Sequence, residues 1–245
     1  MTSKVQTIFI VLCAGVVVAT SLFFVNKFVV QPAQIDADIQ QVQELYASAP
    51  AEKAAKKSSS APDKFATLKK INPDIRGWLT VPGTKINYPV LQSAKSDPEH
   101  YLKYDFKNRK DDHGSVFMQA GCQPASSRNT VLYGHNMLDG TMFRDLLKYD
   151  SATFCKQNPR FSYEDSSGKK TYQIFAVIKE QNGFTRTDFQ SDIDFAMFVQ
   201  ELQKKSIYDT GVSADGWDHI MLLCTCSYET KNNRTVVAGK LLSAT

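Results

Sequence analysis

Apolar and polar positions divide the chain into three parts, and the first is a membrane-type stretch. Residues 8–25 are apolar or small and carry no charged side chain. As a helix they would rise about 27 Å, close to the thickness of a bilayer core. The stretch is long for a signal peptide and no small-x-small cleavage site follows it, so we expect an uncleaved anchor over residues 1–30. Lys4 and the amino terminus oppose only Lys27, so charge orients this anchor weakly.

The second part, residues 31–64, has the texture of a connector. Residues 35–46 place apolar side chains at helical spacing and predict a short amphipathic helix. Residues 47–64 are rich in Ala, Lys, Ser and Pro, a composition that predicts a flexible spacer. We therefore expect a helix and a linker that hold the following domain off the membrane.

The third part, residues 65–245, alternates short runs of β-forming residues with Gly, Pro, Asn and Asp. The runs predict strands at residues 77–81, 88–92, 115–118, 130–133, 171–179, 219–225 and 235–241. Helical patterns cover residues 142–148 and 193–205, the second with Phe195, Phe198, Val199 and Leu202 on one face. Many short strands and few helices predict a mostly β barrel or sandwich.

Composition excludes several classes of protein. Of the 245 residues, 42% are hydrophobic and 22% charged, which is ordinary for a globular chain. The net charge is +4 without a basic stripe interleaved with aromatic residues, so we expect no nucleic-acid partner. The five cysteines include no CxxC pair, which argues against a structural zinc site. We expect neither a metal nor a cofactor.

The candidate nucleophile is Cys226, which ends the β run at residues 219–225. Arg234 opens the next strand, so a hairpin would place the two residues opposite each other. A guanidinium there could lower the pKa of the thiol or stabilise an oxyanion. Free cysteines are often buried core residues, however, and Cys224 shares the same strand face. The residues alone do not choose between the two thiols.

His135 is the candidate proton partner, because it follows the β run at residues 130–133 and stands beside Gly134. A Cys/His pair needs no metal, since the thiolate attacks and the imidazolium protonates the leaving amine. A lone histidine is more often a surface or capping residue. His100 and His113 lie in polar segments and are expected to be solvated, and His219 is expected to be structural.

Several motifs together resemble the sortase family. They are the run YGHNM at residues 133–137, Thr225-Cys226, and Arg234. The segments NPDIRGWL (72–79), INYPV (86–90), Tyr101-Leu102 with Asp105-Phe106, GTMF (140–143) and SYE (227–229) resemble class B. The likeness extends over residues 65–242, most of the part that follows the linker.

This resemblance implies an eight-stranded β-barrel with amino-terminal helices and a helix in the insertion before the nucleophile strand. It implies catalytic roles for His135, Cys226 and Arg234, and so favours Cys226 over Cys224. The residues that it implies for substrate binding are Thr225, Tyr228, Glu229 and Asn136. The family pattern before the nucleophile is Thr-Leu-x-Thr-Cys, from which this chain departs at Leu222 and Cys224.

The resemblance implies a membrane-anchored cysteine transpeptidase outside a Gram-positive cell. Such an enzyme cleaves a carboxyl-terminal sorting signal, Asn-Pro-x-Thr-like in class B, through a thioester. It joins the secreted protein to an amine of peptidoglycan or its precursor, or to a pilin lysine. Three alternatives stay open: a cysteine hydrolase with water as acceptor, a non-catalytic wall-binding module, and a metal site formed by Cys224, Cys226 and a histidine.

Overall fold

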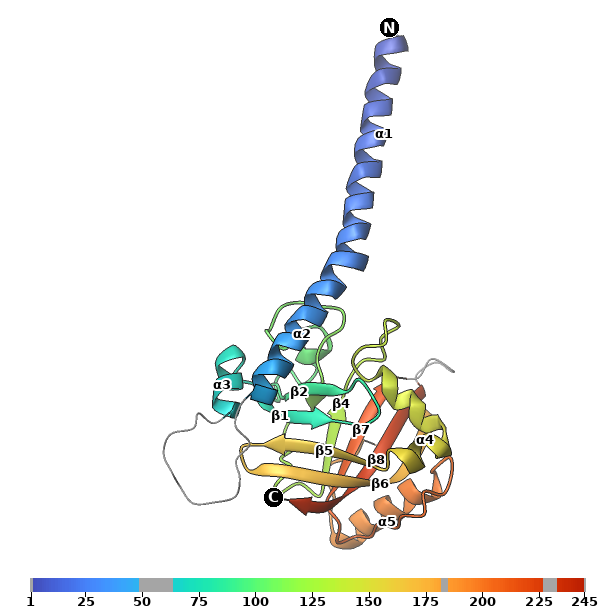
Figure 1. The fold of residues 1–245 in the computed structure, drawn as a ribbon. Coiled ribbons are helices and arrows are strands. Elements are labelled where there is room, and N and C mark those ends of the chain that lie inside the picture. The colour runs from blue at the N-terminus through green and yellow to red at the C-terminus, as the bar shows by residue number, and fades with distance from the viewer. Residues whose placement is uncertain (1, 49–63, 182–184, 227–232, 245) are drawn as a thin grey trace. The chain divides into compact units, whose positions relative to one another are not determined.

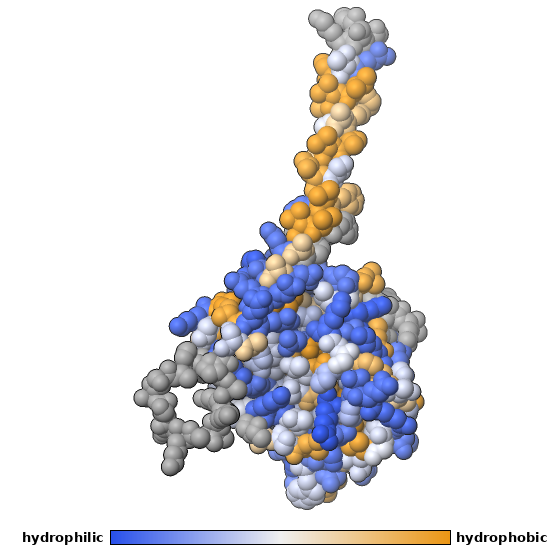
Figure 2. Space-filling view, viewed as in Figure 1, coloured by the Kyte–Doolittle hydropathy of each residue, from blue (hydrophilic) through white to orange (hydrophobic). Residues whose placement is uncertain are grey.

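The computed structural model describes residues 2–48, 64–181, 185–226 and 233–244 (Figure 1). The chain divides into two compact units, Met1–Ser48 and Ala49–Thr245. The first contains helix α1 (Thr2–Val25), a π-helical turn at Asn26–Val30, and helix α2 (Gln31–Ser48). Within the described residues, Val5–Val25 is the one helical segment long and apolar enough to cross a membrane. Its visible surface is largely apolar (Figure 2), which fits the expected anchor.

The second unit is a closed barrel whose strands follow the order β1-β2-β3-β4-β7-β8-β6-β5. The strands are β1 (Ile75–Thr80), β2 (Asn87–Leu91), β3 (Phe117–Met118), β4 (Asn129–Tyr133), β5 (Arg160–Asp165), β6 (Gly168–Gln181), β7 (Ile220–Cys226) and β8 (Asn233–Ala244). Its helices are α3 (Lys64–Ile71), η2 (His100–Leu102), η3 (Arg144–Asp150), α4 (Ala152–Gln157) and α5 (Asp192–Lys204). The prediction of an eight-stranded, mostly β barrel is confirmed.

Most predicted elements are present, and the differences have local causes. Each of the seven predicted strands has a counterpart, whereas β5 was missed because only Phe161 and Tyr163 are apolar within it. The helix predicted at residues 142–148 is a 3-10 helix that begins at Arg144 and ends at Asp150. The helix expected at residues 35–46 lies within α2, while α3 and α4 were not predicted. The expected spacer lies almost wholly outside the described residues.

Helix α5 covers the wall of the barrel on which the site stands. Ser191 accepts a hydrogen bond from the main-chain N–H of Asp194 and so caps the start of this helix. The buried cluster beneath it includes Phe195, Phe198, Val199, Leu202, Ile220, Leu222, Cys224, Val236 and Ala238. Alternation along β7 gives positions 220, 222 and 224 one common face. Among the described side chains of β7, this core therefore extends as far as Cys224.

Leu222, the departure from the family pattern, is explained by the same core. Its side chain is fully buried beneath α5, where a threonine hydroxyl would need a hydrogen-bond partner. The change exchanges a polar group for apolar packing, and it lies away from the open end of the strand.

We predict that Phe195→Ala lowers the free energy of unfolding by about 3–5 kcal/mol, because it leaves a cavity between α5 and the barrel. Ile193→Ala is the matched control on the same helix, since 74% of Ile193 is exposed. It should stay within about 0.5 kcal/mol of the parent. Denaturant titration measures both, and equal losses would contradict the packing described here.

Candidate active site

Three strands of the barrel bring distant parts of the chain to one end of the sheet. Strand β4 runs parallel to β7 and pairs Tyr133 with Cys224, and the N–H of Gly134 donates to the carbonyl of Cys224 over 3.3 Å. Strand β8 runs antiparallel to β7 and pairs Arg234 with Cys226. The residue after Gly134 is His135, so positions 135, 226 and 234 lie at the same end of the sheet.

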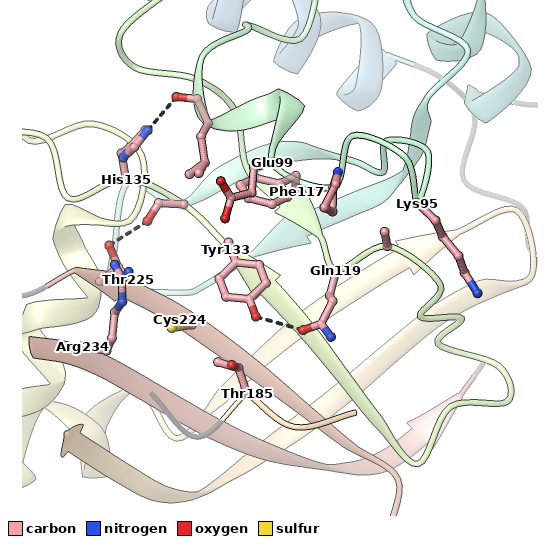
Figure 3. A pocket seen from close by; sticks show the side chains of 14 residues that line it. Lys95, Glu99, Phe117, Gln119, Tyr133, His135, Thr185, Cys224, Thr225 and Arg234 are labelled. Atoms are coloured by element: carbon pink, nitrogen blue, oxygen red, sulfur yellow. Dashed lines mark hydrogen bonds between the residues drawn. The ribbon is translucent and has the colours of Figure 1, made fainter. Parts of the chain in front are cut away.

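A pocket of about 760 Å³ opens at this end of the sheet (Figure 3). Strands β4, β7 and β8 and the residues that follow β4 contribute Tyr133, Gly134, His135, Cys224, Thr225 and Arg234 to its wall. The remaining wall comes from residues 95–102, residues 117–120 and Thr185. Among the described lining residues, Glu99 has the one acidic side chain, whereas Lys95 and Arg234 are cationic.

The structure places the main chain of Cys226 but does not describe its side chain. Cys226 is the last residue of β7, directly across from Arg234. The two residues before it on β7, Cys224 and Thr225, both line the pocket. Tyr228 and Glu229 lie outside the described residues.

His135 is oriented by its surroundings. Its Nε2 lies 2.8 Å from the carbonyl oxygen of Leu102, and a carbonyl only accepts, so Nε2 carries the proton (Figure 3). The main-chain carbonyl of His135 accepts from the N–H of Phe143 over 2.8 Å. The first contact orients the ring and leaves Nδ1 as the nitrogen that can exchange a proton, and the second holds the main chain.

Gly134 and Thr225 join the histidine strand to the cysteine strand. The buried hydroxyl of Thr225 donates to the carbonyl of Gly134 over 2.7 Å (Figure 3). A Cβ at position 134 would lie 2.7 Å from the ring of Phe143, so only glycine allows this close approach. Position 225 therefore acts on the segment that carries His135, in addition to lining the pocket.

Asn136 lies behind the pocket wall. It is 1% exposed and is not among the residues that line the pocket. Its Oδ1 accepts from a guanidinium nitrogen of Arg144 over 3.1 Å, and its main chain forms a bridge with Met142, whose φ is 52°. These contacts hold the loop after His135 in shape.

Sequence reasoning missed a polar chain across the pocket floor. The hydroxyl of Tyr133 donates to Oε1 of Gln119 over 2.9 Å (Figure 3). Nε2 of Gln119 donates in turn to Oγ1 of Thr187 over 2.8 Å. Burial raises the pKa of Tyr133 to about 12, so its hydroxyl stays protonated. The chain ties β4 to the segment before α5. Gln119 and Thr187 lie in loops without a motif, so the sequence carried no signal for them.

The remaining histidines have structural contacts. The expectation that His113 is solvated is wrong, because its ring lies between Asp111 and Asp139 and only 13% of its side chain is exposed. His100 stacks on Tyr104, with ring centroids 4.1 Å apart. Among the residues that the structure describes, no three His, Cys, Asp or Glu side chains are grouped as metal ligands would be.

Comparison with known proteins identifies the family of this chain. The family model described as the sortase domain matches residues 79–242. Sortase B of Listeria monocytogenes is 38% identical over 186 residues, which cover 74% of this chain and 75% of the relative. Sortase B of Staphylococcus aureus is 35% identical over 184 residues, which cover 73% of this chain and 75% of the relative. The solved complex of Staphylococcus aureus sortase B with a substrate superposes with a TM-score of 0.77 at 31% identity, over 88% of this chain and 100% of that one.

The chain therefore belongs to the sortase family of cysteine transpeptidases, and within that family to class B.

We predict that Thr225→Val destabilises the fold by about 1–3 kcal/mol, because it leaves the carbonyl of Gly134 without its donor. Thr235→Val is the matched control, since Thr235 pairs with Thr225 across the sheet and its buried hydroxyl has no partner among the described groups. Thermal unfolding should separate the two variants. An equal loss of stability in both variants would show that the hydrogen bond from Thr225 to Gly134 does not stabilise the fold.

Proposed function

We propose that this enzyme cleaves a carboxyl-terminal sorting signal of secreted proteins and transfers the cleaved chain to an amine through a thioester at Cys226. The observation that carries the proposal is the meeting of positions 135, 226 and 234 beside one pocket. These residue types are those that acyl transfer through a thiol requires: a nucleophile, a proton carrier and a cation near the oxyanion.

In the proposed reaction, the thiolate of Cys226 attacks a backbone carbonyl of the sorting peptide. Arg234 stabilises the negative oxygen of the tetrahedral intermediate. The imidazolium of His135 gives its proton to the departing amine as the C–N bond breaks, and a thioester remains. An incoming amine then attacks the thioester, gives its proton to His135, and releases Cys226 with a new amide bond.

We propose peptide contacts for three of the residues that the resemblance assigns to substrate binding. Thr225 lines the pocket and is proposed to contact the bound peptide. Tyr228 and Glu229, which follow the nucleophile, are proposed to contact it as well. We propose an indirect role for Asn136, because its side chain is buried against Arg144 behind the wall.

Solved relatives support peptide donors and amine acceptors. One sortase B structure is a complex with a substrate and another is a complex with triglycine. We propose that the acceptor here is an amine of peptidoglycan or its precursor, or a pilin lysine. Helix α1 would anchor residues 1–30 in the membrane of a Gram-positive cell. Residues 31–64 would then hold the catalytic domain, residues 65–245, on the outer side, where secreted substrates pass. The first half of the proposed reaction, cleavage of a peptide bond with formation of a thioester, is the step that cysteine peptidases also catalyse.

We predict that purified protein in detergent joins an Asn-Pro-x-Thr-type peptide to a primary amine. Raising the concentration of a triglycine acceptor should replace the hydrolysis product by the amide product, because amine and water compete for one thioester. Chromatography with mass detection measures the ratio. A product that remains purely hydrolytic at saturating amine would identify the enzyme as a hydrolase.

Cys226→Ala should abolish both products, because no other group forms the thioester. Cys224→Ala is the matched control two residues earlier on the same strand, and it should still form both products, because the nucleophilic sulfur at position 226 remains. Rate assays under identical conditions compare the variants. Full activity in Cys226→Ala would exclude Cys226 as the nucleophile, and a loss confined to Cys224→Ala would assign that role to Cys224.

A further inference from the structure

The proposed reaction does not account for a charged contact that joins two loops, one of which carries His135. His113 lies between η2 and β3, and Asp139 lies at the tip of the loop that runs from Gly134 to Phe143. Nε2 of His113 is 2.7 Å from Oδ2 of Asp139, and Nδ1 is 2.8 Å from Oδ1 of Asp111. With 13% of its side chain exposed, His113 is largely enclosed between the two carboxylates.

Both contacts need the charged form of His113. A neutral imidazole has one N–H and one lone pair, whereas a carboxylate only accepts, so a neutral ring would turn a lone pair toward one of the two aspartates. The imidazolium donates to both. Burial by itself lowers the pKa of His113, but hydrogen bonds and charges from Asp139 and Asp111 outweigh it, and the pKa is raised above 6.5.

Asp139 is held in place for this contact. Its Oδ1 accepts from the main-chain N–H and the hydroxyl of Thr141, over 3.0 and 2.7 Å, which leaves Oδ2 for His113. Burial by itself raises the pKa of Asp139, but hydrogen bonds from Thr141 and His113 outweigh it and lower the pKa. Two further charges are near: Asp112 adjoins His113, and the ammonium of Lys85 lies 3.6 Å from where a Cβ of Gly140 would stand.

The same two loops touch again at the imidazole of His135. Its Nε2 donates to the carbonyl of Leu102, in the segment that also carries His113. Main-chain bonds from Asp111 to Lys103 and from Ser115 to Tyr101 make residues 101–115 one connected piece. This piece therefore holds the catalytic loop twice, near its start through His135 and at its tip through Asp139.

We propose that the imidazolium of His113 is a positioning residue, which holds the tip of the loop so that His135 keeps its bond to Leu102 and its aim into the pocket. The proposal rests on the role of His135 given above. Loss of the tie frees the tip, whose neighbour Leu138 is 84% exposed and contributes little packing of its own.

The pH dependence follows in sign from the raised pKa. In an unfolded chain a histidine titrates near 6.5, so the tie contributes fully below about that pH. Its contribution disappears as the pH rises through the raised pKa of the folded state. Activity should therefore fall on the alkaline side through a step that belongs to His113, in addition to any step of the Cys/His pair.

The test compares kcat and KM from pH 5.5 to 9 in full-length protein for the parent, His113→Gln and His113→Arg. At pH 6, His113→Gln should lower kcat roughly tenfold with KM unchanged, as expected for a slightly misplaced catalytic group. It should also lack the alkaline step. His113→Arg keeps a charged planar donor at every pH, so it should retain most of kcat and lack the step as well. His219→Gln, at the far end of β7, should reproduce the parent profile.

Asp139→Asn removes the negative charge of the same tie from an exposed position and carries the test if His113→Gln does not fold. It should match His113→Gln, and the double variant should be no worse than either single one. NMR titration of the His113 ring gives a readout without activity, and its pKa should lie above 6.5 and fall in Asp139→Asn. A His113→Gln profile that superposes on the parent, or a His113 pKa at or below 6.5, overturns the inference. Absence of all transpeptidation in the parent would instead refute the proposed function.

Discussion

The site depends on one constraint, the register of β7 against its two neighbours. Parallel pairing with β4 sets Tyr133 beside Cys224, and antiparallel pairing with β8 sets Arg234 beside Cys226. A shift of one residue in either pairing would turn a participating residue to the other face of the sheet. Most of the surrounding structure stabilises this register, from the α5 core on one face to the Thr225 bond between the strands.

The second layer of organisation lies in the loops that follow these strands. The segment from Gly134 to Phe143 contains a main-chain bridge between Asn136 and Met142 and accepts a hydrogen bond from Arg144. It also contacts residues 101–115 at two points. A separate polar chain through Gln119 reaches the segment before α5. His135 is therefore carried by a loop whose end packs in the core through Met142 and Phe143 and whose outer part is held by hydrogen bonds and charge.

The sequence predicted those features that depend on local pattern. Strands with several apolar residues were predicted correctly. The Gly-His and Thr-Cys motifs indicated the positions that the strand register brings to one end of the sheet. Strand β5 escaped because its inward residues are only Phe161 and Tyr163. The enclosure of His113 and the place of Gln119 escaped because they depend on loop contacts between residues far apart in sequence. Burial of Asn136 escaped for a more local reason, because it depends on how the loop after His135 folds back onto Arg144 of η3.

The central claim is that the sulfur of Cys226, and not that of Cys224, forms the acyl bond beside His135 and Arg234. The most direct measurement is peptide mapping by mass spectrometry after a sorting-type peptide is mixed with the protein and quenched in acid. We expect an acyl adduct on Cys226 that vanishes when an amine is added. An adduct on Cys224, or a turnover that never acylates Cys226, would contradict the claim.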